Sequence, residues 1–463
     1  MMARPGIEAE THGFATVIIG GGPAGTAVIL AACRSGRLER LLDDGLAIVE
    51  ASAAIGAGRI GDYAINSDST ADTFTDCIRN NTHPEFLALR GHPVTLQLTA
   101  AGSEPAPLEL VGKISALIGA ALQRMIAAHP RCAVLTQAQA LQTQNGDDGL
   151  WRTRIQIAGG ARLDLVSQNV VLATGAAQPS ERLDGEMIGG IYALSRCAGR
   201  LMQSGDVLRH GGVQDIAARL AAKPHPRVAI VGGSTSAVAV AHALLTRLDP
   251  QFFGADAVTI LHRRELRIYY PSTDQALAEG YTEFGPEDLC PISQRVFRFA
   301  GLRLDSRELI MQARGIGGRP PEPRLRLHAL QPHDEAAARI IEEADLVIAA
   351  LGYRPHALTC LDARGREIAL FCHRAVAAPL VDDQCRVLDA QKLPLAGLFG
   401  IGLATGFVPR GALGGEPSFS GQANGLWLWQ TAVGSLIVDA LTKPAARYYA
   451  PALAETAEAV TAL

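Results

Sequence analysis

The sequence predicts an α/β protein with two Rossmann-like domains, the second inserted in the first, and three observations support this fold class. The chain has 463 residues, more than a single hydrophobic core usually supports, so at least two domains are expected. Apolar runs at 16–19 and 227–231 have the form of buried parallel strands. Each run ends at a glycine-rich turn that opens a helical pattern, which is how a dinucleotide-binding βαβ unit begins.

Composition and charge narrow the class of partner. Hydrophobic residues make up 48% of the chain and charged residues 19%, which indicates a globular protein. The 42 basic and 46 acidic side chains give a formal net charge of -4 without a long run of one sign. This argues against a nucleic-acid or membrane partner, and a small-molecule substrate is expected. The N-terminus lacks the basic-then-apolar order of a signal peptide, so a cytoplasmic location is predicted. Whether the protein assembles into a homo-oligomer is left open.

Cysteine and histidine spacing bears on the chemistry. None of the eight cysteines pairs at the C-x-x-C or C-x4-C spacing of redox dithiols and zinc sites, so buried, reduced thiols are expected. The histidines form no H-x-x-x-H or H-E-x-x-H arrangement, and no metal site is predicted. A redox-active enzyme dithiol of the usual kind is therefore not expected.

The first glycine turn has the regular G-x-G-x-x-G pattern and consists of Gly20, Gly21, Gly22, Pro23, Ala24 and Gly25. In this pattern the first glycine makes the tight turn, the second lets the backbone approach a pyrophosphate, and the third lets the helix pack on the strand. The next predicted strand ends at Glu50, whose carboxylate can accept hydrogen bonds from ribose hydroxyls. A purely structural turn is the alternative, but the strand, helix and acidic residue favour dinucleotide binding.

The second glycine turn is less regular and consists of Gly232, Gly233, Ser234, Thr235, Ser236 and Ala237. Ser234 replaces the middle glycine and Ala237 the third, so a close backbone approach is less certain here. The strand that follows ends at Arg263 and Arg264 instead of an acidic residue. Guanidinium groups suit the extra 2′-phosphate of NADPH, which a carboxylate would repel. The alternative is that two arginines simply end a surface strand.

Two later motifs complete the pattern: Leu172-Ala173-Thr174-Gly175, and the segment from Asp345 to His356 that contains Gly352. Together with the two glycine turns and Glu50, they resemble the motifs of two-dinucleotide-binding flavoproteins, most closely flavin-containing and N-hydroxylating monooxygenases. The resemblance spans nearly the whole chain. In the second motif Leu351 replaces the usual threonine of the family's D-x-x-x-A-T-G-Y signature.

The resemblance implies FAD on the first Rossmann unit and NADPH on the second. It places an FAD domain at 1–222 and 358–463 around an NADPH domain at 223–357, with Thr174, Gly175 and Gly352 among the cofactor-binding residues. The C-terminal segment would return to FAD through Gly402 and a glycine-rich stretch that contains Gln422. A surface loop followed by a packed helix is the alternative for that stretch.

The resemblance also places the segment 56–70 against the flavin ring, which makes Tyr63, Asn66 and Ser67 candidates for catalytic polar contacts. Helix capping is the alternative role of Asn66 and Ser67. Aromatic residues are concentrated between 262 and 303, where they could line the substrate side of an interface or pack in the core.

The expected protein is an NADPH-dependent monooxygenase that contains FAD and acts on a small nucleophile. N-hydroxylation of an amine is one reaction of this kind. In the resembled enzymes reduced flavin captures oxygen as a C4a-hydroperoxide and passes one oxygen atom to the substrate, while the protein excludes water. One rival hypothesis is an NADPH:acceptor oxidoreductase without oxygen transfer. Another is a flavin-binding sensor that does not use NADPH.

Overall fold

The computed structural model describes residues 11–372 and 378–443, and its larger sheet has nine strands. β1 pairs in parallel with β2 and β8, and β2 with β5, because Val17, Ile18 and Ile48 are apolar and buried on both faces of the sheet. The strands are β1 (Thr11–Ile19), β2 (Leu46–Val49), β5 (Ala133–Leu135), β6 (Ala138–Asn145), β7 (Trp151–Ile157), β8 (Arg162–Leu172), β18 (Thr359–Leu361), β19 (Arg386–Leu388) and β20 (Pro394–Gly400).

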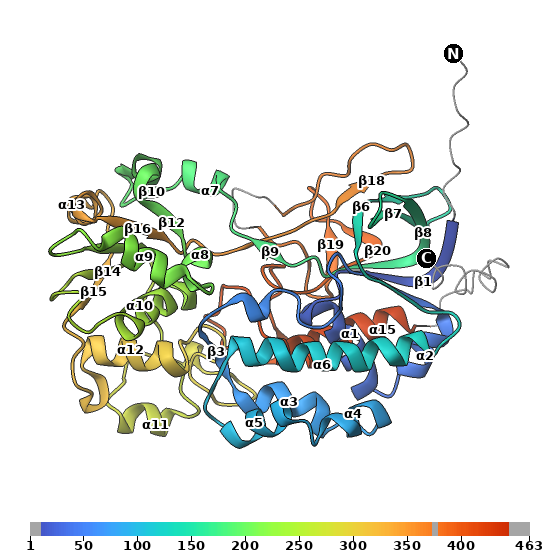
Figure 1. Cartoon of the computed structure of the whole chain (residues 1–463), viewed down its shortest axis with the longest axis horizontal. Helices are drawn as coiled ribbons and strands as arrows, with labels where there is room; N and C mark the ends of the chain where they lie inside the picture. Colours follow the sequence, from blue (N-terminus) through green and yellow to red (C-terminus); the bar gives the residue numbers. More distant parts are fainter. Residues whose placement is uncertain (1–10, 373–377, 444–463) are drawn as a thin grey trace, which may run out of the picture.

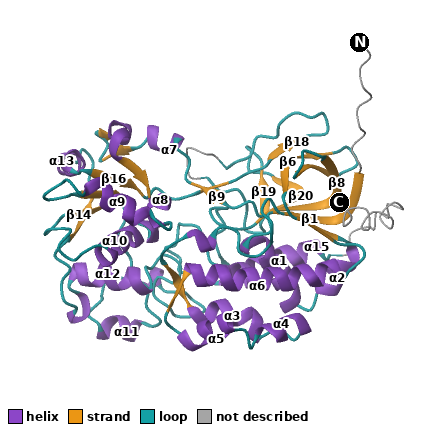
Figure 2. Ribbon diagram, viewed as in Figure 1, coloured by secondary structure: helices purple, strands orange, loops and turns teal. Residues whose placement is uncertain are grey.

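Helices cover this sheet, and several of them lie together on one side of the first domain (Figure 2). α1 packs against the C-terminal helix α15, and α6 lies beside α4 and α5. The helices of this domain are α1 (Pro23–Arg34), α2 (Leu38–Asp44), α3 (Ala71–Arg79), α4 (Pro84–Leu89), α5 (Pro93–Ala101), α6 (Leu108–Ala127), α14 (Leu426–Leu428) and α15 (Gly434–Leu441).

Within the described ranges, α6 is the one helix long and apolar enough to meet the criteria for a membrane span. Its residues include Ile114, Ile118 and Leu122, which are buried in the core of the first domain. The apolar character of α6 is therefore accounted for by its packing inside the fold.

The second sheet has five strands in the order β12-β16-β13-β14-β15, and all of its adjacent strands are parallel. It forms the other lobe of the molecule (Figure 1). The elements of this lobe are β12 (Leu201–Gln203), α8 (Ser204–Leu208), α9 (Gly212–Leu220), β13 (Val228–Val231), α10 (Thr235–Arg247), β14 (Val258–His262), α11 (Thr273–Ala278), α12 (Leu304–Arg314), β15 (Leu325–Ala329), α13 (Glu335–Glu343) and β16 (Leu346–Ala349).

The predicted boundary between residues 222 and 223 is wrong. β12 lies before it but pairs with β16 of the second sheet, and Ile216 and Leu220 belong to the apolar core of that lobe. The physical reason is that the segment before the linker at 223–226 supplies an extra strand, β12, and two helices, α8 and α9, to the second lobe. The sequence linker therefore falls inside this domain and not at its start.

Two connections join the lobes and pair with each other. β9 (Ala176–Ala177) and β17 (Arg354–Pro355) form an antiparallel ribbon between the two sheets (Figure 1). After β17 the chain rejoins the first domain, where β18 pairs with β6 and β20 pairs with β8. The second domain is thus an insertion in the first, as the resemblance implied.

Candidate functional site

A single large cavity of about 1490 Å³ lies between the lobes and includes parts of both glycine turns in its wall. Its volume exceeds the roughly 300–1,000 Å³ typical of a pocket for one small ligand. The wall includes Gly20 and Gly22 from the first turn and Ser234 from the second. The cavity therefore has the size and position to hold two ligands that meet between the domains.

The glycines of the first turn have two different roles, one in the fold and one in ligand binding. Gly20 has φ +100°, a backbone conformation that side chains disfavour. A Cβ atom on Gly25 would lie 1.9 Å from the backbone oxygen of Gly20, whereas one on Gly22 would find its nearest protein atom at 3.5 Å. Gly20 and Gly25 are required by the fold itself, and Gly22 leaves space open at the cavity, where a pyrophosphate would pass.

Glu50 lines the cavity at the end of β2. Its two carboxylate oxygens accept hydrogen bonds from the backbone N–H groups of Gly21 at 2.7 Å and Ser52 at 2.8 Å. These contacts fix the orientation of the carboxylate and leave lone pairs for ribose hydroxyls. Together with the free N–H groups at the start of α1, this arrangement fits the ribose and pyrophosphate of a dinucleotide.

The second glycine turn offers a similar helix start. Gly232 has φ +136° and its position would bring a Cβ within 2.3 Å of the backbone oxygen of Ala350. Ser234, Thr235 and Ser236 all line the cavity, and Ser234, the N-cap of α10, makes no side-chain capping hydrogen bond. The N–H groups and hydroxyls at this helix start can therefore bind a second phosphate group. Gly25, Gly232 and Gly233 are not in the cavity wall.

Arg263 and Arg264 after β14, which were predicted to bind the nucleotide, lie outside the cavity wall. Arg263 instead forms an ion pair with Glu186, which is 6% exposed, and donates to the backbone oxygen of Met187. The Arg263 guanidinium is therefore bound by the buried Glu186 carboxylate. Sequence spacing could not reveal this ion pair.

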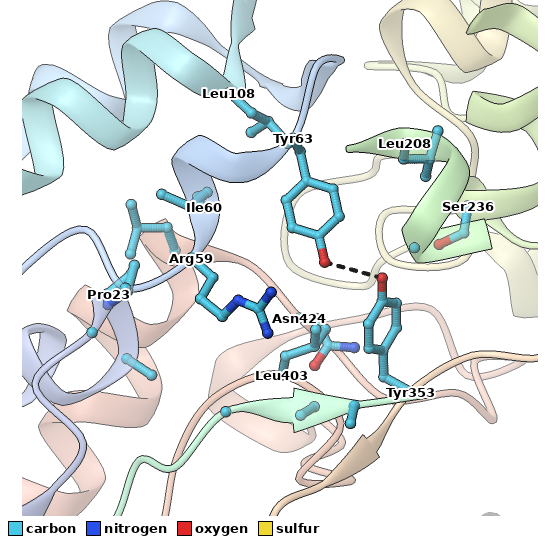
Figure 3. Close-up of a pocket in the computed structure, with 18 of the residues that line it drawn as sticks. Pro23, Arg59, Ile60, Tyr63, Leu108, Leu208, Ser236, Tyr353, Leu403 and Asn424 are labelled. Atoms are coloured by element: carbon cyan, nitrogen blue, oxygen red, sulfur yellow. Dashed lines mark hydrogen bonds between the residues drawn. The ribbon is translucent and has the colours of Figure 1, made fainter. Parts of the chain in front are cut away.

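Tyr63 meets Tyr353 across the cavity, and their hydroxyl oxygens lie 3.3 Å apart. The two rings point toward each other, Tyr63 from the first lobe and Tyr353 from the chain just before β17, with Arg59, Leu403 and Asn424 around them (Figure 3). Burial, and secondly the hydrogen bond with Tyr63, raise the pKa of Tyr353 above its usual value. Tyr353 therefore keeps its proton at neutral pH and lines the cavity as a neutral group.

Asn66 and Ser67 also line the cavity, but they lie in strand β3 (Asn66–Thr70), which pairs with β4 (Pro105–Pro107). The capping alternative is wrong, since Thr70 is the N-cap of α3. The Asn66 amide donates to the Asp305 carboxylate at 2.9 Å, and Asp305 belongs to α12 of the second domain. Asn66 thus connects the two domains, while Ser67 accepts from the backbone N–H of Ser69.

Of the residues predicted from the later motifs, most lie in the cavity wall and one lies outside it. Thr174, Gly175, Gly352 and Gln422 line the cavity. Gly402 does not, but a Cβ there would lie 3.0 Å from the Cβ of Ala24 in the first glycine turn. The C-terminal segment therefore packs on the first dinucleotide site, and the roles of these residues toward a cofactor stay predictions.

Sequence reasoning missed Asp68 and Arg303, which both line the cavity. Asp68 follows the predicted Ser67 directly, and Arg303 lies at the end of the aromatic segment 262–303. Of the aromatic residues there, Tyr270, Tyr281 and Phe297 are buried in the core, and Phe299 lines the cavity. A charged residue next to a predicted site residue was the available signal for Asp68, whereas Arg303 is brought to the cavity only by tertiary folding.

Asp68 is accessible from the cavity yet closely surrounded by protein, and this desolvation raises the pKa of its carboxyl group, while Arg303 opposes the shift. A raised folded-state pKa means that ionisation costs stability above the pKa of the unfolded chain, about 3.9. Asp68→Asn should therefore raise the melting temperature at pH 7, and the gain should vanish as pH falls below about 4, where Asp68 is protonated in both states. Thermal melts across this pH range check it, and a lowered melting temperature at pH 7 would contradict it.

Comparison with known proteins identifies the family. Residues 14–285 match the family described as pyridine nucleotide-disulphide oxidoreductase. The chain is also 33% identical over 440 residues to the CMP-5'-(3-aminopropyl)phosphonate hydroxylase of Streptomyces rubellomurinus, a match that covers 93% of this chain and 98% of that protein. The chain belongs to the pyridine nucleotide-disulphide oxidoreductase family. It is an oxidoreductase, and the predicted cofactors FAD and NADPH are those of this group.

Solved structures confirm the fold class. The L-lysine 6-monooxygenase of Pseudomonas syringae has a TM-score of 0.53 at 15% identity, covering 92% of this chain and 99% of that one. The FAD-bound cadaverine monooxygenase of Erwinia amylovora has a TM-score of 0.53 at 12% identity, covering 93% and 94%. The predicted resemblance to N-hydroxylating flavin monooxygenases is thereby confirmed.

The family's name refers to disulphide chemistry, which makes the positions of the cysteines relevant. All eight cysteines are free, and none of them lines the cavity. Within residues 11–372 and 378–443, no cluster of three or more His, Cys, Asp or Glu side chains could hold a metal ion. The cavity wall combines apolar side chains such as Ile60 and Trp429 with hydroxyl, phenol, amide, imidazole and charged side chains.

Proposed function

We propose that this enzyme N-hydroxylates a primary amine, with NADPH as reductant, FAD as the flavin and molecular oxygen as the source of the hydroxyl oxygen. The observation that carries the proposal is the continuous cavity that joins two dinucleotide-type helix starts and contains no thiol in its wall. Reducing equivalents that reach a flavin there have oxygen or a diffusible molecule as acceptor. The hydroxylase relative, similar along nearly the whole chain, favours oxygen.

The chain's own residues bind, orient and shield. The N–H groups at the start of α1 and the carboxylate of Glu50 would hold the first dinucleotide, and Ser234, Thr235 and Ser236 at α10 would hold the second. Bound FAD, once reduced, would activate oxygen and supply one oxygen atom to the amine nitrogen. Tyr63 and Tyr353 line the same cavity and meet through their hydroxyl groups, where their rings would help to keep water from the reacting atoms.

The substrate class follows from the relatives. The Streptomyces rubellomurinus protein is named for an aminopropyl phosphonate, and the two structural neighbours are named for lysine and cadaverine. All three names contain a primary amine at the end of an alkyl chain. We therefore take a terminal alkylamine as the nucleophile of this enzyme.

A panel of terminal alkylamines, offered with NADPH and oxygen to the FAD-loaded enzyme, tests the proposal. At least one amine should accelerate NADPH oxidation and yield its hydroxylamine in near-equal amount, because a productive substrate competes with release of hydrogen peroxide. A thioether panel is the control for nucleophile class. The proposal fails if every amine leaves all consumed NADPH accounted for as hydrogen peroxide, or if an added quinone is reduced instead.

A further inference from the structure

A glutamine side chain ties the ribbon between the lobes to the second lobe. Gln178 follows β9 directly and lines the cavity. Its amide Nε2 donates to the Ser204 hydroxyl at 2.8 Å, and its Oε1 accepts from the Gly205 backbone N–H at 2.8 Å. The Gln203 side chain donates in turn to the Gln178 backbone oxygen at 2.9 Å. Three hydrogen bonds therefore join one residue of the connection to the start of α8.

The other end of α8 is joined to the first lobe. The Ala64 N–H donates to the backbone oxygen of Leu208 at 2.8 Å, and the His210 N–H donates to the backbone oxygen of Asp62 at 3.1 Å. Leu208 is the last residue of α8, and the two first-lobe partners flank Tyr63 in the sequence. α8 is thus held at its start by the connecting ribbon and at its end by the segment that brings Tyr63 to the cavity.

α8 also packs against α10, the helix that begins at the second glycine turn. Ser234, Thr235 and Ser236 at this turn line the cavity. One short helix therefore contacts the ribbon, the first lobe and the helix that presents the second dinucleotide site. A shift of α8 would change the distance between the two dinucleotide sites.

The backbone at Gly205 shows how closely these parts approach one another. A Cβ on Gly205 would lie 2.6 Å from Gln178 Oε1 and 3.2 Å from the Tyr353 hydroxyl oxygen. That hydroxyl meets the hydroxyl of Tyr63 at 3.3 Å (Figure 3). The start of α8, the amide of Gln178 and the two phenols thus converge in one part of the cavity wall. Because the amide uses a donor and an acceptor on neighbouring residues of α8, it fixes direction as well as distance.

We propose that Gln178 is a positioning residue for flavin reduction. Acting through α8, its amide keeps the second dinucleotide site at the distance and angle at which a nicotinamide ring can meet a flavin ring. Reacting atoms must lie about 3–3.5 Å apart, and a misplacement of about 1 Å can slow a reaction about a hundredfold. Gln178 belongs to neither glycine turn, so it sets the rate of reduction and not the affinity for a dinucleotide. This inference goes beyond the proposed N-hydroxylation, because it depends only on the use of FAD and NADPH.

Gln178→Ala tests the inference in the FAD-loaded enzyme, under anaerobic conditions and without an amine. At saturating NADPH its flavin should be reduced at least about tenfold more slowly than that of wild type. The Kd for NADP+, measured by calorimetry, should stay within about twofold of the wild-type value. Gln214→Ala is the matched control, because Gln214 is exposed on α9 of the same lobe and lies outside the cavity wall. This control should reduce its flavin at the wild-type rate.

Two further measurements separate positioning from a general loss of structure. Hydrogen exchange at the Gly205 N–H, followed without NADPH, should be faster in Gln178→Ala because this donor loses its acceptor, while β13 and β16 exchange as in wild type. Ser204→Ala removes the other side-chain partner of Gln178. It should slow flavin reduction in the wild-type background and add little in Gln178→Ala, since both substitutions break the same contact.

Three results would overturn the inference. The first is a wild-type rate of flavin reduction in Gln178→Ala at saturating NADPH. The second is a Kd for NADP+ that rises by as much as the rate falls, as damage to the binding site would cause. The third is faster hydrogen exchange throughout the second sheet, as a general structural role would produce. Because amine and oxygen are both absent, none of these results depends on whether the enzyme hydroxylates amines.

Discussion

Gly25→Ala is expected to destroy the FAD site and to destabilise the first domain. The new Cβ would lie 1.9 Å from the backbone oxygen of Gly20 and 3.3 Å from Ile18 Cγ2, so either β1 or α1 must move. Neither can move freely, because both are packed in the core. Overpacking of this kind costs about 1–3 kcal/mol or more. Urea denaturation of the apoprotein and FAD retention on purification measure the two effects.

Gly22→Ala is the matched comparison within the same turn. Its Cβ would have 3.5 Å to the nearest protein atom, the Cα of Gly58, so the apoprotein should unfold at nearly the wild-type urea concentration. FAD affinity should still fall, since the methyl group occupies the space through which the pyrophosphate passes. Equal stability loss in both variants would contradict this division of roles between Gly22 and Gly25.

Glu416→Ala is expected to cause a second large loss, at the contact between the domains. Glu416 is 3% exposed, and its carboxylate accepts from the backbone N–H groups of Phe299 at 3.0 Å and Ala300 at 2.7 Å. Hydrogen bonds to a charged group are worth about 1.5–3 kcal/mol each, and alanine leaves both donors without their acceptor. We expect a destabilisation on the order of 3 kcal/mol, measured by urea denaturation.

Glu416→Ala should also weaken ligand binding in the cavity. Phe299 and Arg303 line the cavity, and both lie in the segment that Glu416 holds. Glu416→Gln keeps one acceptor oxygen and should recover part of the stability and of the ligand affinity. If alanine and glutamine variants unfold at the wild-type urea concentration, the contact does not hold this segment in solution.

Local patterns explain which parts of the site were predictable. Gly22, Glu50 and Ser234 to Ser236 lie at the cavity because a strand that runs into a helix brings its turn to the carboxyl edge of a parallel sheet. That geometry is set within about thirty residues, so spacing alone reveals it. The insertion of one Rossmann-like domain in the other was implied by the resemblance to flavin monooxygenases and not by any local spacing.

The rest depends on contacts between distant residues. Arg263 is captured by Glu186 from the connecting segment, and the Asn66 side chain reaches Asp305 in another domain. β12 is a three-residue strand, too short for its pattern to be distinguished from a loop. Asp68 and Arg303 line one cavity only when both lobes are folded, so no spacing in the sequence relates them.

A single-turnover experiment tests the account's central claim most directly. The FAD-loaded enzyme is reduced anaerobically with one equivalent of NADPH, and its flavin absorbance should bleach. Heavy-isotope molecular oxygen is then admitted together with the best-binding terminal amine. The account predicts that the label appears in the hydroxylamine product, in an amount close to that of the NADPH. Label found solely in hydrogen peroxide, with the amine recovered unchanged, would contradict it.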